Sequence, residues 1–309
     1  MLRGAISIDI DTLATHFKGF GLQRDDYTYF DFQKGIANFL KLLSEFKLPA
    51  TFFIVGKDLH HEPNCLTLKQ AVADGHEIAN HSMHHVQGFR YLTPAGKLKE
   101  IQEAAAIIHE KVQRKTVGFR APGWNIDQET LNILNSQKYL YDSSIFPSFF
   151  NLPLKLLHYQ AMKGRPLADR TTLGQYRNMF VSPHPYQIAK NQGIVELPIT
   201  VTPLIRLPFF ATFLLKTGYE MFKKSYQLIK LWQRPIIYEF HLFDFVDFSL
   251  SEIADQIPSR GIKGMYLPQS IHTTYRKKID LFRHAIEFMI RDYKFTTLET
   301  FAHNYLNDV

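Results

Sequence analysis

Two histidines four positions apart stand in the stretch His81-Ser82-Met83-His84-His85. If this stretch forms a helical turn, His81 and His85 face the same way. Neutral imidazole is the commonest protein ligand for zinc and similar divalent metals. The spacing therefore predicts half of a metal site, with His84, three positions after His81, as the alternative second ligand.

Two carboxylates lie two positions apart near the start of the chain, at Asp9 and Asp11. Residues 5–11 alternate apolar and polar side chains, which predicts a strand with its isoleucines on one face and its aspartates on the other. An unpaired buried charge is costly. Two carboxylates on one strand face therefore indicate either solvent exposure or a site that uses both acids.

The rest of the chain alternates strand-like and helix-like segments with short connections. Strands are expected at residues 5–11, 51–55, 76–80, 116–119, 139–142, 195–198, 236–242 and 295–298. Helices are expected at 32–47, 66–74, 94–112, 128–134 and 275–292, with a helical region at 209–232 and a short final helix. This alternation is typical of a parallel α/β sheet or barrel. The chain has no G-x-G-x-x-G and no Walker loop, so nothing supports a nucleotide-binding version.

Polar groups of catalytic type follow five of the expected strands. In parallel α/β folds, functional residues gather at the carboxyl ends of the strands. We therefore expect one site at that end of the sheet, and its members are Asp9, Asp11, His81, His85, Arg120, Asp142 and His241.

Composition and charge narrow the classes of function. The 309 residues are 45% hydrophobic and 21% charged, which is globular composition, and no repeat or linker divides the chain. We expect a single domain spanning 1–309, with an irregular insertion around 146–194. The net charge of +7 is spread widely without a nucleic-acid-binding motif, so we expect no nucleic-acid partner. An acidic substrate or an anionic membrane surface suits this charge better.

The start of the chain and its single cysteine, Cys65, bear on localisation. The first residues lack the apolar core of a signal peptide, and one cysteine excludes an intramolecular disulfide. The longest apolar run, 204–215, is interrupted by Arg206 and Pro208 and is too short to span a bilayer. We expect a cytoplasmic protein, with peripheral association at the inner face of the membrane left open.

The ordered motifs resemble those of the NodB-homology polysaccharide deacetylase family over roughly residues 4–245. They are Asp9-Ile10-Asp11, His81-Ser82-x-x-His85, Arg120-Ala121-Pro122-Gly123-Trp124, Tyr141-Asp142-Ser143-Ser144 and Phe240-His241. The resemblance implies a distorted (β/α) barrel with fewer than eight parallel strands. It also implies hydrolysis of an N-acyl or O-acyl group from a sugar, with one divalent metal.

Carried onto this chain, the resemblance implies that Asp11, His81 and His85 bind the metal. We expect zinc, although the same ligands accept iron, nickel, cobalt or manganese. Asp9 would be the general base. His241 would be the general acid that protonates the leaving amine.

The remaining motif residues would support this pair. Arg120 would hold Asp9 ionised, and Asp142 would orient His241 unless it merely begins a turn. Trp124 and Pro122 would contact the sugar. Glu239, on the same strand face as His241, is a rival for the acid role.

The first motif departs from the common family pattern of two adjacent aspartates, because Ile10 separates them. This D-x-D form resembles a cytoplasmic branch of the superfamily that includes the deformylase of undecaprenyl-linked aminoarabinose. Together with the basic, aromatic region from Lys155 to Lys230, the resemblance predicts an amino sugar with an acetyl or formyl group as the substrate. This sugar is free, polymeric or lipid-linked. The alternatives are a cyclic amide or imide hydrolase and a non-catalytic sugar-binding relative. The acyl group, the sugar and the oligomeric state stay open.

Overall fold

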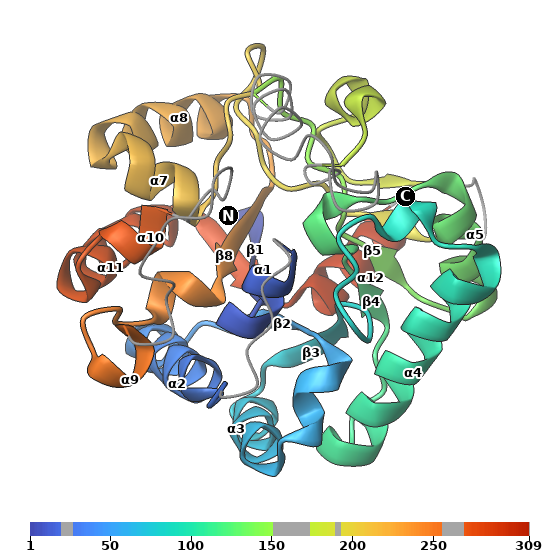
Figure 1. Ribbon diagram of the computed structural model, residues 1–309. Coiled ribbons are helices and arrows are strands. Elements are labelled where there is room, and N and C mark those ends of the chain that lie inside the picture. The colour runs from blue at the N-terminus through green and yellow to red at the C-terminus, as the bar shows by residue number, and fades with distance from the viewer. Residues whose placement is uncertain (20–26, 151–173, 189–192, 255–268, 309) are drawn as a thin grey trace, which may run out of the picture.

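The structure is a computed structural model, and it describes residues 1–19, 27–150, 174–188, 193–254 and 269–308. A curled sheet lies at the centre of the molecule, with helices around the outside (Figure 1). Its parallel row runs β7-β5-β4-β3-β2-β1-β8; β6 pairs antiparallel with β7, and β9 pairs parallel with β1. The strands are β1 (Leu2–Ile10), β2 (Thr51–Ile54), β3 (Glu77–Asn80), β4 (Gly118–Phe119), β5 (Tyr141–Asp142), β6 (Tyr186–Gln187), β7 (Val195–Glu196), β8 (Ile236–His241) and β9 (Tyr293–Thr296).

Hydrogen bonds join the two ends of the parallel row, between β8 and the segment that follows β7. The backbone N–H of Thr200 donates to the carbonyl of Ile237 at 3.2 Å. The N–H of Ile237 donates to the hydroxyl of Thr200 at 2.7 Å. The sheet is therefore a distorted (β/α) barrel with fewer than eight parallel strands in its row, which confirms the fold class expected from the sequence.

Helices cover the outer face of the barrel (Figure 1). The isoleucines of β1 pack there against aromatic residues such as Phe39 of α2 and Phe282 of α11, as the period-two pattern predicts. The helices are α1 (Leu13–Gly19), α2 (Phe30–Phe46), α3 (Glu62–Ala73), α4 (Pro94–Val112), α5 (Gln128–Ser136), α7 (Ala211–Thr217), α8 (Tyr219–Leu231), α9 (Ser251–Ala254), α10 (Gln269–His272), α11 (Tyr275–Met289) and α12 (Leu298–Asp308).

Helix α12 closes the end of the barrel at which the strands begin. Leu298 and Phe301 pack against the inner side chains of the barrel, among them Phe53 and Ile237. The backbone N–H of Leu298 donates to the hydroxyl of Thr51, the first residue of β2, at 2.9 Å. Apolar side chains therefore fill the end of the barrel at which the strands begin. The polar residues lie at the opposite end, where the strands finish.

Two parts of the chain differ from the simplest expectation. The helical region at 209–232 is two helices, α7 and α8, because Gly218 between them has a φ of 84°. In the insertion expected at 146–194, the described part holds a short 3-10 turn (Tyr176–Phe180) and β6. Residues 151–173 and 189–192 lie outside the described part, and the single-domain expectation stays a prediction. No helix in the described ranges has the length and apolar character needed to cross a membrane.

Gly118 of β4 leaves room for the ring of Tyr141, which a hydrogen bond of 2.7 Å to Glu77 holds in place. A methyl group at Gly118 would lie 2.0 Å from Cζ of that ring. We expect Gly118→Ala to lower the free energy of unfolding by about 1–3 kcal/mol or more, measured by urea denaturation. Gly96→Ala in α4 is the control, and it should lose much less stability, because the nearest atom to its added methyl group would be Thr93 Oγ1 at 3.3 Å. Equal stability of the two variants would contradict this packing.

Candidate metal centre and active site

The loop after β3 carries both histidines of the predicted metal pair. The helical turn that would align the two histidines does not form, because Ser82 and His85 have left-handed φ angles of 65° and 52°. Side chains fix the turns instead: Asn80 Oδ1 accepts the Ser82 N–H at 2.8 Å, and Ser82 Oγ accepts the His85 N–H at 3.0 Å. These turns bring the rings of His81 and His85 to a centroid distance of 4.9 Å.

Asp11, directly after β1, completes a set of three donor atoms with the two histidines. Its Oδ1 lies 3.1 Å from His85 Nε2 and 3.4 Å from His81 Nε2. Among the described residues, all three atoms are buried without a hydrogen-bond partner. His81 Nδ1 lies 2.7 Å from the carbonyl of Arg120, which makes Nε2 the nitrogen with a free lone pair. Since such atoms are costly to bury unpaired, these residues fit a divalent metal.

The charges around Asp11 favour the ionised form that a metal ligand needs. Burial alone raises the pKa of Asp11. His85 and His81 more than offset this effect and hold the pKa well below its usual range. The carboxylate is therefore ready to bind a cation at neutral pH.

Arg120, in the loop after β4, lies fully buried at the centre of the site. Its Nη1 is 2.6 Å from Asp9 Oδ1 and 3.4 Å from Glu239 Oε1. Its Nη2 donates to the hydroxyls of Ser7 and Ser143 at 3.1 and 3.0 Å, and Nε donates to the carbonyl of Ser143 at 2.8 Å. The guanidinium thus joins β1, β8 and the loop after β5.

Asp9 is the inward-facing carboxylate of β1 that pairs with Arg120. Burial raises the pKa of Asp9, but the positive charge of Arg120, with His81 and His241, lowers it below the ordinary value. Its Oδ2 lies 3.8 Å from His81 Nε2. An ionised carboxylate beside the ligand set has the position of a general base.

His241 ends β8 beside Asp9, with which it is paired in register across the two strands. The expected contact with Asp142 is wrong, because His241 Nδ1 has no hydrogen-bond partner among the described residues. The carboxyl group beside its ring is that of Glu239, with Oε1 3.9 Å from Nε2. The side chain of His241 is 22% exposed, and that of Glu239 is fully buried.

Asp142 instead belongs to a buried carboxyl pair with Glu196 of β7. The two residues are in register on neighbouring strands. Asp142 accepts hydrogen bonds from the hydroxyl and the N–H of Ser144, at 2.7 and 3.1 Å. Burial, and then the charge of Asp142, raise the pKa of Glu196 well above its usual range, so Glu196 keeps a proton. The pair fixes the loop that contacts Arg120.

The two expected sugar contacts, Trp124 and Pro122, are buried. The indole N–H of Trp124 donates to Glu239 Oε1 at 3.1 Å. Its ring packs against Phe146 and stands edge-on to His241, with centroid distances of 5.0 and 6.1 Å. Trp124 thus lies beside Glu239 and His241, but its buried ring does not offer the open face that sugar stacking needs.

His84 does not join the other two histidines. Its Nδ1 lies 2.7 Å from Glu100 Oε1, and its side chain is 45% exposed.

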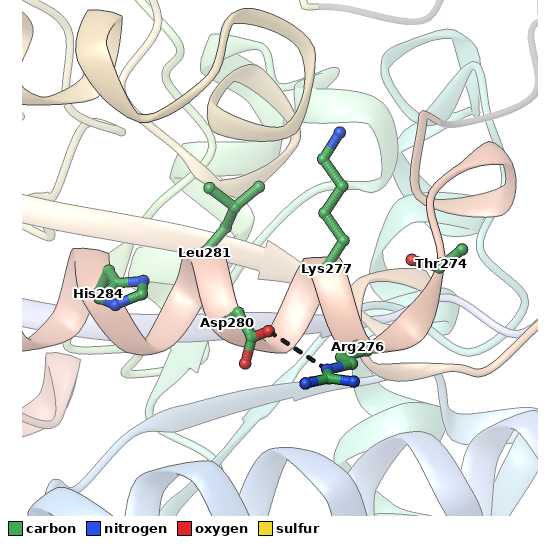
Figure 2. A pocket seen from close by; sticks show the side chains of 6 residues that line it. All are labelled: Thr274, Arg276, Lys277, Asp280, Leu281 and His284. Carbon is green, nitrogen blue, oxygen red and sulfur yellow. Dashed lines mark ion pairs between the residues drawn. The ribbon is translucent and has the colours of Figure 1, made fainter.

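A shallow surface pocket of about 410 Å³ lies on α11 between Thr274 and His284. Figure 2 shows the residues that line it, and Asp11, His81 and His85 are not among them.

Sequence reasoning underrated Glu239 and missed Glu196 and Ser7. Alternation places Glu239 on the face of His241, and it places Ser7 on the face of Asp9, so both could have been found from strand periodicity. The direct pairing of Ser7 with Glu239 depends on the register of β1 and β8, which the sequence does not show. Glu196 is a lone acid in an apolar strand, and that is the signal that could have identified it.

Known proteins resemble this chain in sequence and in fold. The polysaccharide deacetylase family model matches residues 17–141. A peptidoglycan deacetylase-like protein of Gibberella zeae is 26% identical over 206 residues, covering 64% of this chain and 56% of that protein. A peptidoglycan deacetylase of Helicobacter pylori is 27% identical over 150 residues, covering 47% of this chain and 50% of that protein. The chain thus spans about half the length of these relatives.

Among solved structures, a polysaccharide deacetylase described as putative, from Mycobacterium smegmatis, superimposes with a TM-score of 0.62 at 18% identity, covering 98% of this chain and 89% of that one. An allantoinase gives 0.60 at 14% identity, with 98% and 89% covered. At these identities the likeness shows the fold alone. The sequence matches show that residues 17–141 are similar to the polysaccharide deacetylase family.

Proposed function

We propose that this chain is a metal-dependent hydrolase that removes an N-acyl group, acetyl or formyl, from an amino sugar. The observation that carries the proposal is the convergence of three unpaired buried donor atoms beside the ionised Asp9 and the half-buried His241. The deacetylase names of the relatives support a sugar substrate. No contact in the described residues favours the cyclic amide alternative.

In this mechanism Asp11, His81 and His85 would hold the metal, with zinc as our first expectation. The bound metal would supply Lewis acidity toward the acyl carbonyl and the attacking water. Asp9 would take a proton from that water, and Arg120 would keep its carboxylate ionised and aimed. His241, on the neighbouring strand, would give a proton to the leaving nitrogen, because an amide anion is a very poor leaving group.

Asp9→Asn tests the general base. We expect it to bind zinc as the wild type does and to lose about 10²–10⁴-fold in kcat for release of acetate or formate. The substrate panel contains N-acylated sugars, both free and lipid-linked. Asp280→Asn is the control, because Asp280 is exposed on α11. Equal activity of Asp9→Asn and the wild type would contradict the proposal.

We further propose that the chain belongs to the D-x-D branch, that its substrate is lipid-linked and that it acts at the inner face of the membrane. An apolar rim of Phe149, Phe180, Leu204 and Ile205 supports them, with exposed fractions of 40%, 75%, 74% and 55%. Arg206 holds the rim together, because its guanidinium lies 5.3 Å from the Phe149 ring and donates to the carbonyl of Val181 at 2.8 Å. Lys155, which helped to motivate this idea, lies outside the described residues.

The charge of the rim suits anionic lipid. In the described residues 143–150, 174–188 and 193–219, the one acidic side chain is the buried Glu196, and Arg177 and Lys216 are exposed. Basic and apolar groups together favour binding to an anionic bilayer surface.

Flotation with phosphatidylglycerol vesicles at low salt tests this association. Burial of Leu204 and Ile205 in the bilayer would contribute roughly 1.5–3 kcal/mol each. We therefore expect the double variant Leu204→Ser/Ile205→Ser to lose at least about tenfold in vesicle binding. Leu66→Ser is the control, since Leu66 is 61% exposed on α3. Absence of wild-type binding, or equal losses in both variants, would remove the membrane part of the proposal.

A further inference from the structure

Beside the three ligands lies a second group, formed by Asp9, Glu239 and His241. One oxygen or nitrogen atom from each lies within 4.8 Å of the others, which is close enough to hold a metal. Arg120 argues against a metal there, because its Nη1 is 2.6 Å from Asp9 and 3.4 Å from Glu239. The protein already supplies the positive charge between the two carboxyl groups, so another explanation of Glu239 is needed.

Glu239 is a fixed carboxyl group. Its side chain is fully buried, and Oε1 accepts the indole N–H of Trp124 at 3.1 Å while facing Arg120. The strand holds it on the same face as His241, and Oε1 lies 3.9 Å from His241 Nε2. That distance exceeds a hydrogen bond, so the N–H of the ring stays available to another acceptor. The distance is still short enough for the charge of the carboxylate to act on the ring.

We propose that Glu239 is the positioning residue of the general acid, in the role expected of Asp142. The inference rests on the proposed deacylase function. Its carboxyl group faces the His241 ring without a hydrogen bond, so it would stabilise the imidazolium through its charge. As the C–N bond of the amide breaks, the imidazolium gives its Nε2 proton to the leaving nitrogen, which yields a neutral amine and a neutral imidazole.

The surroundings of Glu239 disfavour an unbalanced negative charge. Burial raises the pKa of Glu239 well above its usual range; Arg120 opposes this effect, and the charge of Asp9 and a hydrogen bond with Asp9 add to it. An imidazolium 3.9 Å from Oε1 would be a second positive group, besides Arg120, that favours the carboxylate form of Glu239.

Glu239→Gln tests this role, because it keeps the size and the carbonyl acceptor of the side chain and removes the charge. The two substrates are an N-acetylglucosamine oligomer, whose amine must be protonated to leave, and 4-nitrophenyl acetate, whose phenolate leaves without a proton. We expect kcat for the amide to fall by about 10²-fold or more with KM little changed. Hydrolysis of the ester should be nearly unaffected.

Three further measurements separate this role from a structural one. The chain has two tryptophans, so in a Trp232→Phe background the fluorescence reports on Trp124, and its emission maximum should be kept in Glu239→Gln and shifted in Glu239→Leu. Asp142→Asn is the comparison variant, and any loss it causes should be equal for the amide and the ester. Zinc content should stay at one per chain in Glu239→Gln.

The outcomes that would overturn the proposal are distinct. Equal losses on the amide and the ester, or no loss on either, would exclude a role of Glu239 in proton donation. Two zinc ions per wild-type chain, one of them lost in Glu239→Gln, would assign the group to a second metal instead. A wild type that releases acetate or formate from no N-acylated sugar of the panel, free or lipid-linked, would overturn the proposed function, and this inference with it.

Discussion

The buried guanidinium of Arg120 is the interaction on which the rest of the site depends. A charge at the centre of a barrel is tolerated only where its donors are satisfied and its charge is balanced. Asp9 balances it, and the oxygens of Ser7 and Ser143 accept its other N–H groups. The Cζ atom of Arg120 lies over the ring of Phe53, 4.1 Å from its centroid. Removing any one partner would leave a polar group unpaired in the interior, so the arrangement is fixed as a unit.

This unit sets the roles of the neighbouring groups. The carbonyl of Arg120 fixes the tautomer of His81, and its guanidinium keeps Asp9 ionised and restrains Glu239. Arg120 thus contacts His81, Asp9 and Glu239. The buried pair of Asp142 and Glu196 lies behind the loop that holds Arg120, and a retained proton lets two acids share that position without mutual repulsion.

The sequence predicted the barrel, but not the contacts within the site. Alternation in β1 placed Asp9 and Asp11 on one face because a strand has a fixed period of two. The rings of His81 and His85 come together through left-handed turns at Ser82 and His85, and not through the helical turn that would align residues at this spacing. Asp142 was wrongly expected beside His241 because the path of the loop after β5 leaves no periodic signal, whereas Glu239, two positions before His241 in β8, could be placed beside it by strand periodicity. Burial of Trp124 likewise depends on packing against Phe146.

Zinc binding by matched histidine variants tests the central claim, that the folded chain brings Asp11, His81 and His85 to one point. In equilibrium dialysis of the wild type, His85→Gln and His84→Gln, we predict one zinc per chain for the wild type and for His84→Gln. We predict that His85→Gln loses the site, with an affinity at least about tenfold lower. Zinc binding that His84→Gln abolishes and His85→Gln leaves intact would contradict the account, and so would a wild-type chain that binds no zinc.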